Sequence, residues 1–230
     1  MLLGLAADIH GNLAALDAAL RDMESAGVEE LLVAGDLTGY YYQTAQVLER
    51  LEQWKVCAVR GNHESEFRRW LAGDGREQYH QRYGSSLRVA EDELTAEQRG
   101  YLDGLPDVIS ISRGDASISM THATPNSETD YVYPDADRDA LRPFSDPPAN
   151  LWVVGHTHHP VAWRTGHGLI VNPGSIGQQR CRRPGAHWAT FDTESGALVF
   201  RVSDYDPSGL IAECAQRDPH VPYLQRVLRR

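Results

Sequence analysis

The sequence has few cysteines for its length, only three among 230 residues. They are odd in number and widely separated, at Cys57, Cys181 and Cys214. This pattern argues against a disulfide framework and is typical of a protein kept in a reducing compartment. We therefore expect a cytoplasmic protein that is held together by a packed core, which a chain of this length is long enough to bury.

Basic residues are also scarce. Lys and Arg number 22 against 32 Asp and Glu, which gives a formal net charge of −10. General binding of DNA or RNA depends on neutralising phosphates with basic side chains, so nucleic acid is a poor candidate partner. Bound divalent cations would offset the negative charge locally, and a small phosphorylated substrate therefore stays compatible with the composition.

Long hydrophobic runs are missing as well. Met1–Ala7 is apolar, but no basic leader accompanies it and Asp8 ends it. The run is too short for a membrane span or for the hydrophobic region of a signal peptide, so it predicts a buried strand and no membrane partner. Because no repeat, low-complexity tract or linker divides the chain, we expect one domain over residues 1–230.

Apolar runs and helical periods alternate in the first quarter of the chain. The apolar runs predict strands at Leu2–Ala7, Leu31–Ala34 and Val56–Val59. After the capping candidate Asn12, apolar residues from Leu13 to Met23 follow helical spacing, and Thr44–Trp54 shows a similar pattern. Strands that alternate with helices are typical of parallel strands joined by crossover helices, so this part predicts an α/β fold.

The pattern changes twice in the rest of the chain. Residues 67–105 are polar and mainly helical, with a capping box at Thr95 and Gln98, and we interpret them as a flanking helical segment. After Pro106 the period is two, and a hairpin is expected from Val108–Ser112 and Ser117–Thr121. Further short strands are expected at Leu151–Val154, Val161–Arg164, Leu169–Val171, His187–Asp192 and Leu198–Val202. Together the strands predict two sheets, each covered by helices on its outer face.

Polar motifs follow five of the predicted strands. In chain order they are Asp8-x-His10, Gly35-Asp36, Gly61-Asn62-His63-Glu64, Thr121-His122 and Gly155-His156-Thr157-His158. In open α/β sheets ligands gather beyond the carboxyl ends of the strands, so we expect these turns to converge. Carboxylate, imidazole and amide groups together suit Mn, Fe, Zn, Co or Ni better than Ca or Mg. Any one motif occurs often by chance, whereas the complete ordered set favours a metal site.

This motif series resembles the signature of the calcineurin-like metallophosphoesterase superfamily. The resemblance extends from Leu2 to Gly177, which is most of the chain. The length and the stretch Asn172-Pro173-Gly174-Ser175 resemble its small prokaryotic phosphodiesterase branch. The resemblance implies a four-layer α-β-β-α sandwich of two mixed sheets flanked by helices, in agreement with the two sheets expected above.

The resemblance also implies ligands for two divalent transition-metal ions. By this resemblance, one ion is bound by Asp8, His10 and His158. The other ion is bound by Asn62, His122 and His156, and Asp36 bridges the two ions. A bridging carboxylate would hold the ions about 3.5–4 Å apart, and a hydroxide between them would be the nucleophile. Manganese is our first choice of metal, with Fe, Zn, Co or Ni as alternatives.

His63 is the imidazole that the resemblance places outside the metal ligands. As imidazolium it could protonate the leaving alkoxide or neutralise charge on the phosphoryl group, which would make it the catalytic residue. The alternative is a histidine that orients Asp36 through a hydrogen bond. Candidates for substrate contact are Arg60, Tyr40 and Arg180, each of which could equally be structural or solvated.

One departure from the family pattern bears on the substrate. Protein phosphatases of this superfamily continue the second motif as Gly-Asp-x-x-Asp-Arg-Gly, whereas here the run is Gly35-Asp36-Leu37-Thr38-Gly39-Tyr40 and the Arg is missing. We therefore expect hydrolysis of phosphodiesters or nucleotide-like substrates, with a phosphomonoesterase or protein phosphatase as the alternative. A non-catalytic scaffold protein would show eroded ligands, and here every ligand position carries a competent side chain. The oligomeric state stays open.

Overall fold

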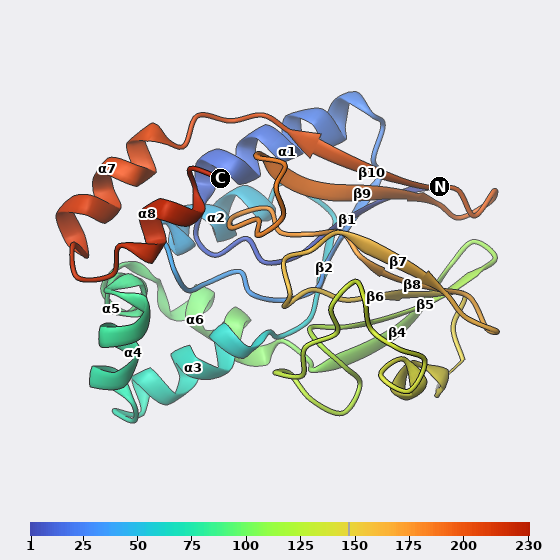
Figure 1. Ribbon diagram of the computed structural model, residues 1–230, viewed down its shortest axis with the longest axis horizontal. Helices are drawn as coiled ribbons and strands as arrows, with labels where there is room; N and C mark the ends of the chain where they lie inside the picture. The colour runs from blue at the N-terminus through green and yellow to red at the C-terminus, as the bar shows by residue number, and fades with distance from the viewer. Residues whose placement is uncertain (147) are drawn as a thin grey trace.

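The computed structural model describes residues 1–146 and 148–230 and contains two five-stranded sheets (Figure 1). The first sheet has the order β10-β9-β1-β2-β3. Its strands are β1 (Leu2–Ala6), β2 (Glu30–Val33), β3 (Val56–Ala58), β9 (Ala186–Asp192) and β10 (Leu198–Ser203). The first three strands are parallel, as predicted, while β9 runs antiparallel to both β1 and β10.

The second sheet has the order β4-β5-β6-β8-β7. Its strands are β4 (Val108–Arg113), β5 (Ala116–Thr121), β6 (Leu151–Val153), β7 (Val161–Arg164) and β8 (Leu169–Asn172). Strands β5, β6 and β8 are parallel, and the hairpin partners β4 and β7 are antiparallel to β5 and β8. Both sheets are therefore mixed, and the predicted fold class of two mixed sheets flanked by helices is confirmed.

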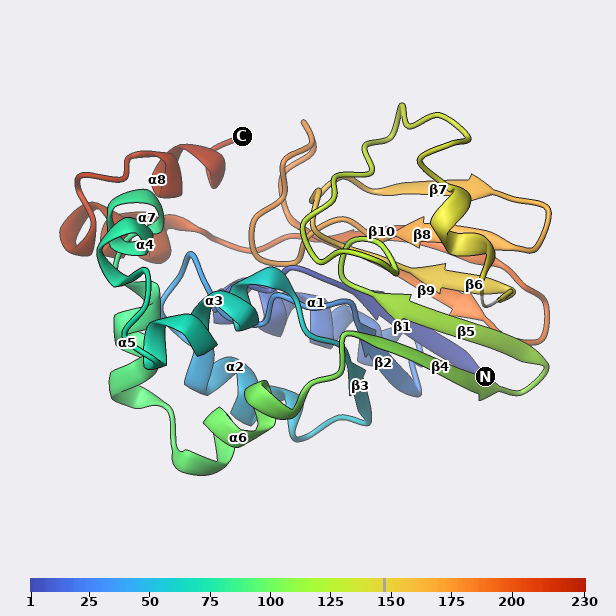
Figure 2. The same cartoon turned by 90° about the horizontal axis from the view of Figure 1, so that it is seen from below.

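The two sheets lie against each other (Figures 1 and 2). Alternate residues of their strands form the core between them. Leu3 and Leu5 of β1 join one apolar core with Ile118 and Met120 of β5. Because successive side chains of a strand point to opposite faces, Ala6 lies in a second core on the other face of the first sheet. That core is completed by the crossover helices α1 (Leu13–Ser25) and α2 (Thr44–Leu51).

The outer face of the second sheet is covered mainly by the segment between β5 and β6. This segment contains the 3₁₀ helix η1 (Arg142–Ser145), and Phe144 packs edge-on against Trp152 with ring centroids 5.5 Å apart. Among the described residues, the helical cover expected for this face is confined to η1. The rest of the described connection is irregular, and it places Tyr131 beside His156 at the carboxyl ends of the strands.

Further helices lie at one end of the sandwich. They are α3 (Asn62–Leu71), α4 (Arg76–Tyr83), α5 (Ser86–Glu93), α6 (Ala96–Gly104), α7 (Ser208–Arg217) and α8 (Tyr223–Val227). In Figures 1 and 2 the C-terminal pair α7 and α8 lies next to α4 and α5. Tyr41 and Tyr42 are buried against α5, α7 and α8, which makes them packing residues of this end.

Hydrogen bonds explain where several helices begin or end. The Asn12 side chain caps α1 by accepting from the Ala15 N–H at 3.2 Å, and Thr95 and Gln98 form the capping box of α6, both as predicted. Helix α2 ends at Leu51 rather than at the predicted Trp54, because the Lys55 carbonyl accepts from Leu31 of β2 and the chain must already be extended there. Within the described residues, every helix is too short or too polar to cross a membrane.

Candidate metal centre

All the predicted ligand residues lie at the carboxyl ends of strands. Asp8 and His10 follow β1, Asp36 follows β2, and Asn62 begins α3 just after β3. His122 follows β5, while His156 and His158 follow β6. Three groups of side chains gather here, and within each group the ligand atoms lie within 4.8 Å of one another. The groups are Asp8–His10–His158, Asp36–His122–His156 and His10–Asp36–His63. The predicted convergence of the five motifs is therefore present in the fold.

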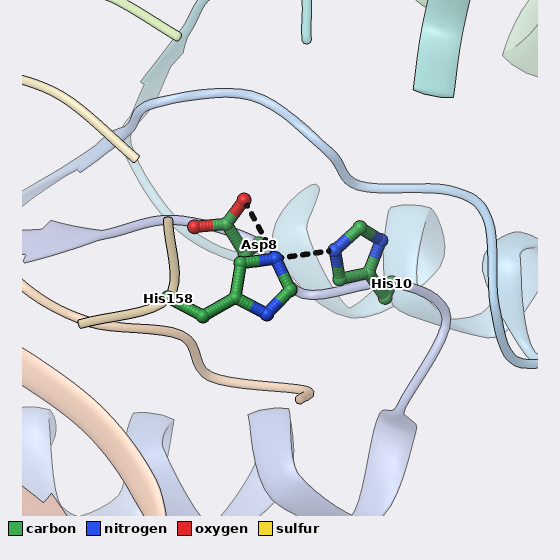
Figure 3. Close-up of side chains that lie close together, drawn as sticks. All are labelled: Asp8, His10 and His158. Carbon is green, nitrogen blue, oxygen red and sulfur yellow. Dashed lines mark hydrogen bonds and ion pairs between the residues drawn. The ribbon is translucent and has the colours of Figure 1, made fainter. Parts of the chain in front are cut away.

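The first group joins the turn after β1 to the turn after β6 (Figure 3). His158 Nε2 lies 3.4 Å from Asp8 Oδ1 and 3.2 Å from His10 Nε2, and all three side chains are buried. The Nδ1 atoms of both histidines face backbone carbonyls, of Thr38 for His10 and of Gln178 for His158. A carbonyl only accepts, so each Nδ1 carries a proton and each Nε2 presents a lone pair.

The second group is organised in the same way. His122 Nδ1 donates to the Ala34 carbonyl at 2.7 Å, and His122 Nε2 lies 3.0 Å from Asn62 Oδ1 and 3.3 Å from Asp36 Oδ2. His156 directs Nε2 to the Thr129 carbonyl at 3.2 Å, which leaves its Nδ1 as the lone pair. Asp36 Oδ2 is also 3.7 Å from His10 Nε2 and so lies between the two groups.

Electron-pair donors face one another in the first group. His10 and His158 oppose lone pair to lone pair, and Asp8 Oδ2 is buried without a hydrogen-bond partner. Such an arrangement is repulsive unless a cation or proton lies among the atoms. The donor set of carboxylate oxygens, imidazole nitrogens and an amide oxygen fits divalent transition-metal ions.

The electrostatics of the site favour positive charge. Burial lowers the pKa of His122, but the Asp36 and Asp8 carboxylates outweigh burial and raise this pKa to about 10. Burial raises the pKa of Asp36, yet the surrounding histidines, His122 first, hold it well below its ordinary value. Burial, followed by repulsion from His122, lowers the pKa of His156 to about 4. Asp8 and Asp36 are thus ionised. His10, His156 and His158 are neutral, as metal ligands must be, whereas His122 is cationic until a metal ion displaces its proton.

Backbone strain is concentrated at the same residues. Among the described residues, six other than glycine have positive φ angles, between 52° and 66°. They are Asp8, His10, Asp36, Tyr40, His156 and His158. Such conformations cost free energy and persist where the surrounding structure imposes them, typically at functional sites. Five of the six are predicted metal ligands, so the strain marks this site without reference to any motif.

Residues without a predicted role hold the ligands in place. The buried Glu64 carboxylate accepts from the N–H groups of Asp36 at 2.9 Å, Thr38 at 3.0 Å and Gly61 at 2.8 Å. Burial, with the nearby Asp36 charge, raises the pKa of Glu64 to about 7. Ser175 donates its hydroxyl to the Asp8 carbonyl at 2.7 Å. Glu64 stands beside Asn62 in the third motif, and this was the signal that could have assigned it. Ser175 lies in the Asn172–Ser175 stretch, away from the ligands in sequence, and only the fold brings it to Asp8.

A cavity opens onto the ligands. It is lined by Asp36, Tyr40, Asn62, His63, Tyr83, Tyr131, His156, His158 and Arg180. The Arg180 guanidinium donates to the Tyr40 hydroxyl at 3.1 Å, so two of the three residues proposed to contact substrate lie here together. His63 Nδ1 is 3.0 Å from the Tyr79 hydroxyl, and burial lowers the pKa of His63 to about 4. The ring is therefore neutral near pH 7 and is not the imidazolium expected from the sequence.

Arg60, the third substrate candidate, lies elsewhere. Its guanidinium donates to Asp107 at 2.9 Å and to the carbonyls of Asp103 and Leu105. Arg60 lines a different hollow, on the Thr121 side of His122. These contacts tie the chain just after β3 to the last turn of α6 and to the residues that follow it.

An aromatic pair beside the site was not anticipated. The rings of Tyr131 and Tyr133 are stacked, with centroids 5.4 Å apart and planes 7° from parallel. Tyr131 also lies 4.3 Å from the ring of His156, although it is 53% exposed. The pair belongs to the irregular connection between β5 and β6, whose sequence has no periodicity that could have placed it.

A sandwich of two mixed sheets with Asp, Asn and His side chains gathered at the strand ends defines a protein of the phosphoesterase class. The calcineurin-like phosphoesterase superfamily domain matches residues 1–196 of the sequence. This match covers most of the chain, and the protein therefore belongs to that superfamily.

Individual proteins agree with this assignment. Phosphodiesterase YfcE of Escherichia coli K12 is 25% identical over 230 residues, which cover 94% of this chain and 98% of YfcE. The crystal structure of a metallophosphoesterase from Sphaerobacter thermophilus has a TM-score of 0.81 at 25% identity and covers 100% of this chain and 98% of its own. A hypothetical protein from Pyrococcus horikoshii OT3 has the same fold, with a TM-score of 0.86 at 21% identity and coverage of 99% and 97%.

Proposed function

We propose that this protein hydrolyses phosphodiesters with two divalent metal ions as cofactors. The observation that carries the proposal is the pair of buried ligand groups that meet at Asp36, which lies 3.7 Å from His10 on one side and 3.3 Å from His122 on the other. The ligands would be Asp8, His10 and His158 for one ion, Asn62, His122 and His156 for the other, and Asp36 for both. When bound, the ions would supply Lewis-acid charge to the phosphoryl oxygens and lower the pKa of water. Manganese remains our first choice.

The protein itself holds the ligand side chains in fixed orientations before the substrate binds. His10, His122 and His158 each have Nδ1 bound to a backbone carbonyl, which fixes both the tautomer and the orientation of the ring. Glu64 holds the backbone on both sides of Leu37, so that the turn carrying Asp36 keeps its strained conformation. Little reorganisation is then needed when the substrate arrives.

His63 would serve the leaving group. Burial raises the pKa of Tyr79 well above its usual value, so this phenol keeps its proton. In this proposal it donates to His63 Nδ1 at 3.0 Å rather than to Ser86 Oγ at 3.5 Å. The proton of the neutral ring then resides on Nε2, on a side chain that lines the cavity. From there it would be donated to the departing alkoxide as Nδ1 takes the Tyr79 proton, and water would return a proton to the Tyr79 oxygen. Arg180, also in the cavity wall, would neutralise charge on the phosphate.

Three observations support a diester of a nucleotide-like alcohol. Arg180 is the one Lys or Arg among the described residues lining the cavity, which suits the single charge of a diester better than the double charge of a monoester. A relative of the chain is named phosphodiesterase. The exposed face of the stacked Tyr131–Tyr133 pair offers a surface for a nucleobase or aryl group, because aromatic rings stack on bases.

The metal requirement is tested by removing the metal and the bridge separately. Metal-depleted protein should be inactive on a chromogenic diester and should recover with Mn²⁺. Asp36→Asn should lower the Mn²⁺-supported rate more than about 100-fold, because one neutral amide oxygen cannot serve two ions. Asp115→Asn, at an exposed hairpin turn, is the matched control and should keep the wild-type rate. Activity that is indifferent to both metal removal and Asp36→Asn would sink the two-metal proposal.

The substrate is tested with a panel assayed on the Mn²⁺-loaded enzyme. We expect kcat/KM to be higher for chromogenic diesters than for the matching monoesters, and higher for nucleotide diesters than for dialkyl phosphates. A preference for monoesters would contradict the diester assignment and favour a phosphomonoesterase. Full metal occupancy with no hydrolysis of any member would favour a scaffold protein.

A further inference from the structure

A second group of side chains that could hold a metal ion lies where α4 meets the loop between α7 and α8 (Figures 1 and 2), and none of its residues lines the cavity. His80 of α4 and two loop residues, Asp218 and His220, each place one ligand atom within 4.8 Å of the others. The imidazole rings have centroids 4.9 Å apart. His220 Nε2 lies 3.2 Å from the His80 carbonyl oxygen, which leaves Nδ1 of His220 as the lone pair.

The Asp218 carboxylate is fully buried, but hydrogen bonds satisfy only one of its oxygens. Oδ2 accepts from the Tyr42 hydroxyl at 2.8 Å and from the N–H and hydroxyl of Ser85, each at 2.9 Å. Oδ1 is buried without a hydrogen-bond partner. Among the ion pairs of the described residues, none involves Asp218. Buried carboxylates usually pair with a cation or bind a metal, so this oxygen points to a ligand.

We infer that His80, Asp218 and His220 bind a structural transition-metal ion of the Zn²⁺ type. Two imidazole nitrogens and one carboxylate oxygen suit this ion, and water can take the fourth position. Bonds of about 2.0–2.1 Å place tetrahedral ligand atoms about 3.4 Å apart, so the imidazoles must turn inward to bind. His220 is exposed and His80 half-buried, so both rings have room to turn, while three hydrogen bonds hold Asp218 still.

The ion would fasten the C-terminal helices to the helical end of the sandwich. The Gly84–Ser85 turn approaches Asp218 so closely that a Cβ on Gly84 would lie 2.5 Å from Oδ2. The same carboxylate binds Tyr42, which belongs to the chain between β2 and α2. One ion would thus connect α4 to a carboxylate that already holds two other segments, and it would act as a clip rather than as a catalyst.

The test is to count tightly bound Zn²⁺ in the full-length protein by equilibrium dialysis and elemental analysis. His220→Ala should bind one ion fewer than the wild type. His167→Ala, an exposed histidine in the β7–β8 turn, is the matched control and should bind as many ions as the wild type. All three proteins have the same active site, so the difference does not depend on the proposed function. His80→Ala is the second variant and should show the same loss.

Hydrogen exchange locates the ion that is counted. In the wild type and in His167→Ala, Zn²⁺ should slow amide exchange in residues 76–83 and 218–222. In His220→Ala this protection should disappear, while circular dichroism shows that the fold is kept. Equal ion counts in His220→Ala, His80→Ala and the wild type would overturn the inference. So would protection by Zn²⁺ that is restricted to the strand ends around Asp36.

Discussion

Each histidine among the ligands already has one nitrogen occupied by the protein. For His10, His122 and His158 the partner is a backbone carbonyl, and the nitrogen left over faces the other ligands. The residue types and their order in the motifs predicted which side chains meet. The motifs could not predict the tautomers, because the carbonyls belong to Thr38, Ala34 and Gln178, distant in sequence from the histidines they hold.

His63 provides the prediction at the scale of the single residue. We expect His63→Asn to retain its metal ions but to lose about 10²- to 10⁴-fold in kcat on diesters with alkoxide leaving groups, because a general acid contributes about this much. The loss should be small on nitrophenyl esters, whose leaving group needs no proton. The measurement is kcat against leaving-group pKa, together with metal content. His167→Asn, remote from the cavity, is the control.

Two outcomes would contradict this role for His63. An equal loss for good and poor leaving groups would exclude proton donation, and loss of metal from the variant would indicate that His63 orients or ligates instead.

The packing around His63 leaves its ring little room to take another position. A Cβ on Gly39, whose φ is +87°, would lie only 2.2 Å from His63 Nδ1, so glycine is required there for the ring to take its place.

At the scale of elements, one ion-pair cluster connects the two sheets. Glu30 of β2 is 1% exposed and accepts from Arg113, at the end of β4, at 2.6 and 2.7 Å. Lys55, which precedes β3, lies 2.7 Å from the same carboxylate. The hydrogen bonds from Arg113 outweigh burial and lower the pKa of Glu30 below its ordinary value of 4.5.

Glu30→Gln should therefore destabilise the fold in a pH-dependent way. A carboxylate whose pKa is lowered by folding adds stability above its unfolded pKa, and this stability is lost as pH falls through the folded value. At pH 7 we expect the free energy of unfolding to fall by about 1–3 kcal/mol, and the difference from wild type to shrink below about pH 4.5. Urea unfolding at several pH values measures it, with the exposed Glu24→Gln as control. A constant difference across that range would contradict the assignment.

Elements were predictable where their pattern was local. The strands β1, β2 and β3 and the helix α1 follow from apolar runs, helical spacing and the Asn12 cap, all within a few residues of each other. The end of α2 was missed because a sheet contact from Lys55 to Leu31 decides it. The position of Tyr131 and Tyr133 beside His156 depends on a long irregular connection and could not be read from the sequence.

At the scale of the whole molecule, the fold brings together residues from both sheets. The ligands after β1, β2 and β3 come from the first sheet, and those after β5 and β6 come from the second. The motifs predicted this meeting through the rule for strand ends and through family resemblance. The order β4-β5-β6-β8-β7 was not predictable, because the pairing of short strands after long connections is decided by packing across the core.

The central claim is that Asp36 joins two metal ions in one site. Electron paramagnetic resonance of the Mn²⁺-loaded protein tests it most directly, because two Mn²⁺ ions about 3.5–4 Å apart couple magnetically whereas separate ions do not. We predict a coupled spectrum for the wild type and for Asp115→Asn, and its loss in Asp36→Asn. A wild-type spectrum of isolated Mn²⁺ alone, or a coupled spectrum that persists in Asp36→Asn, would contradict the account.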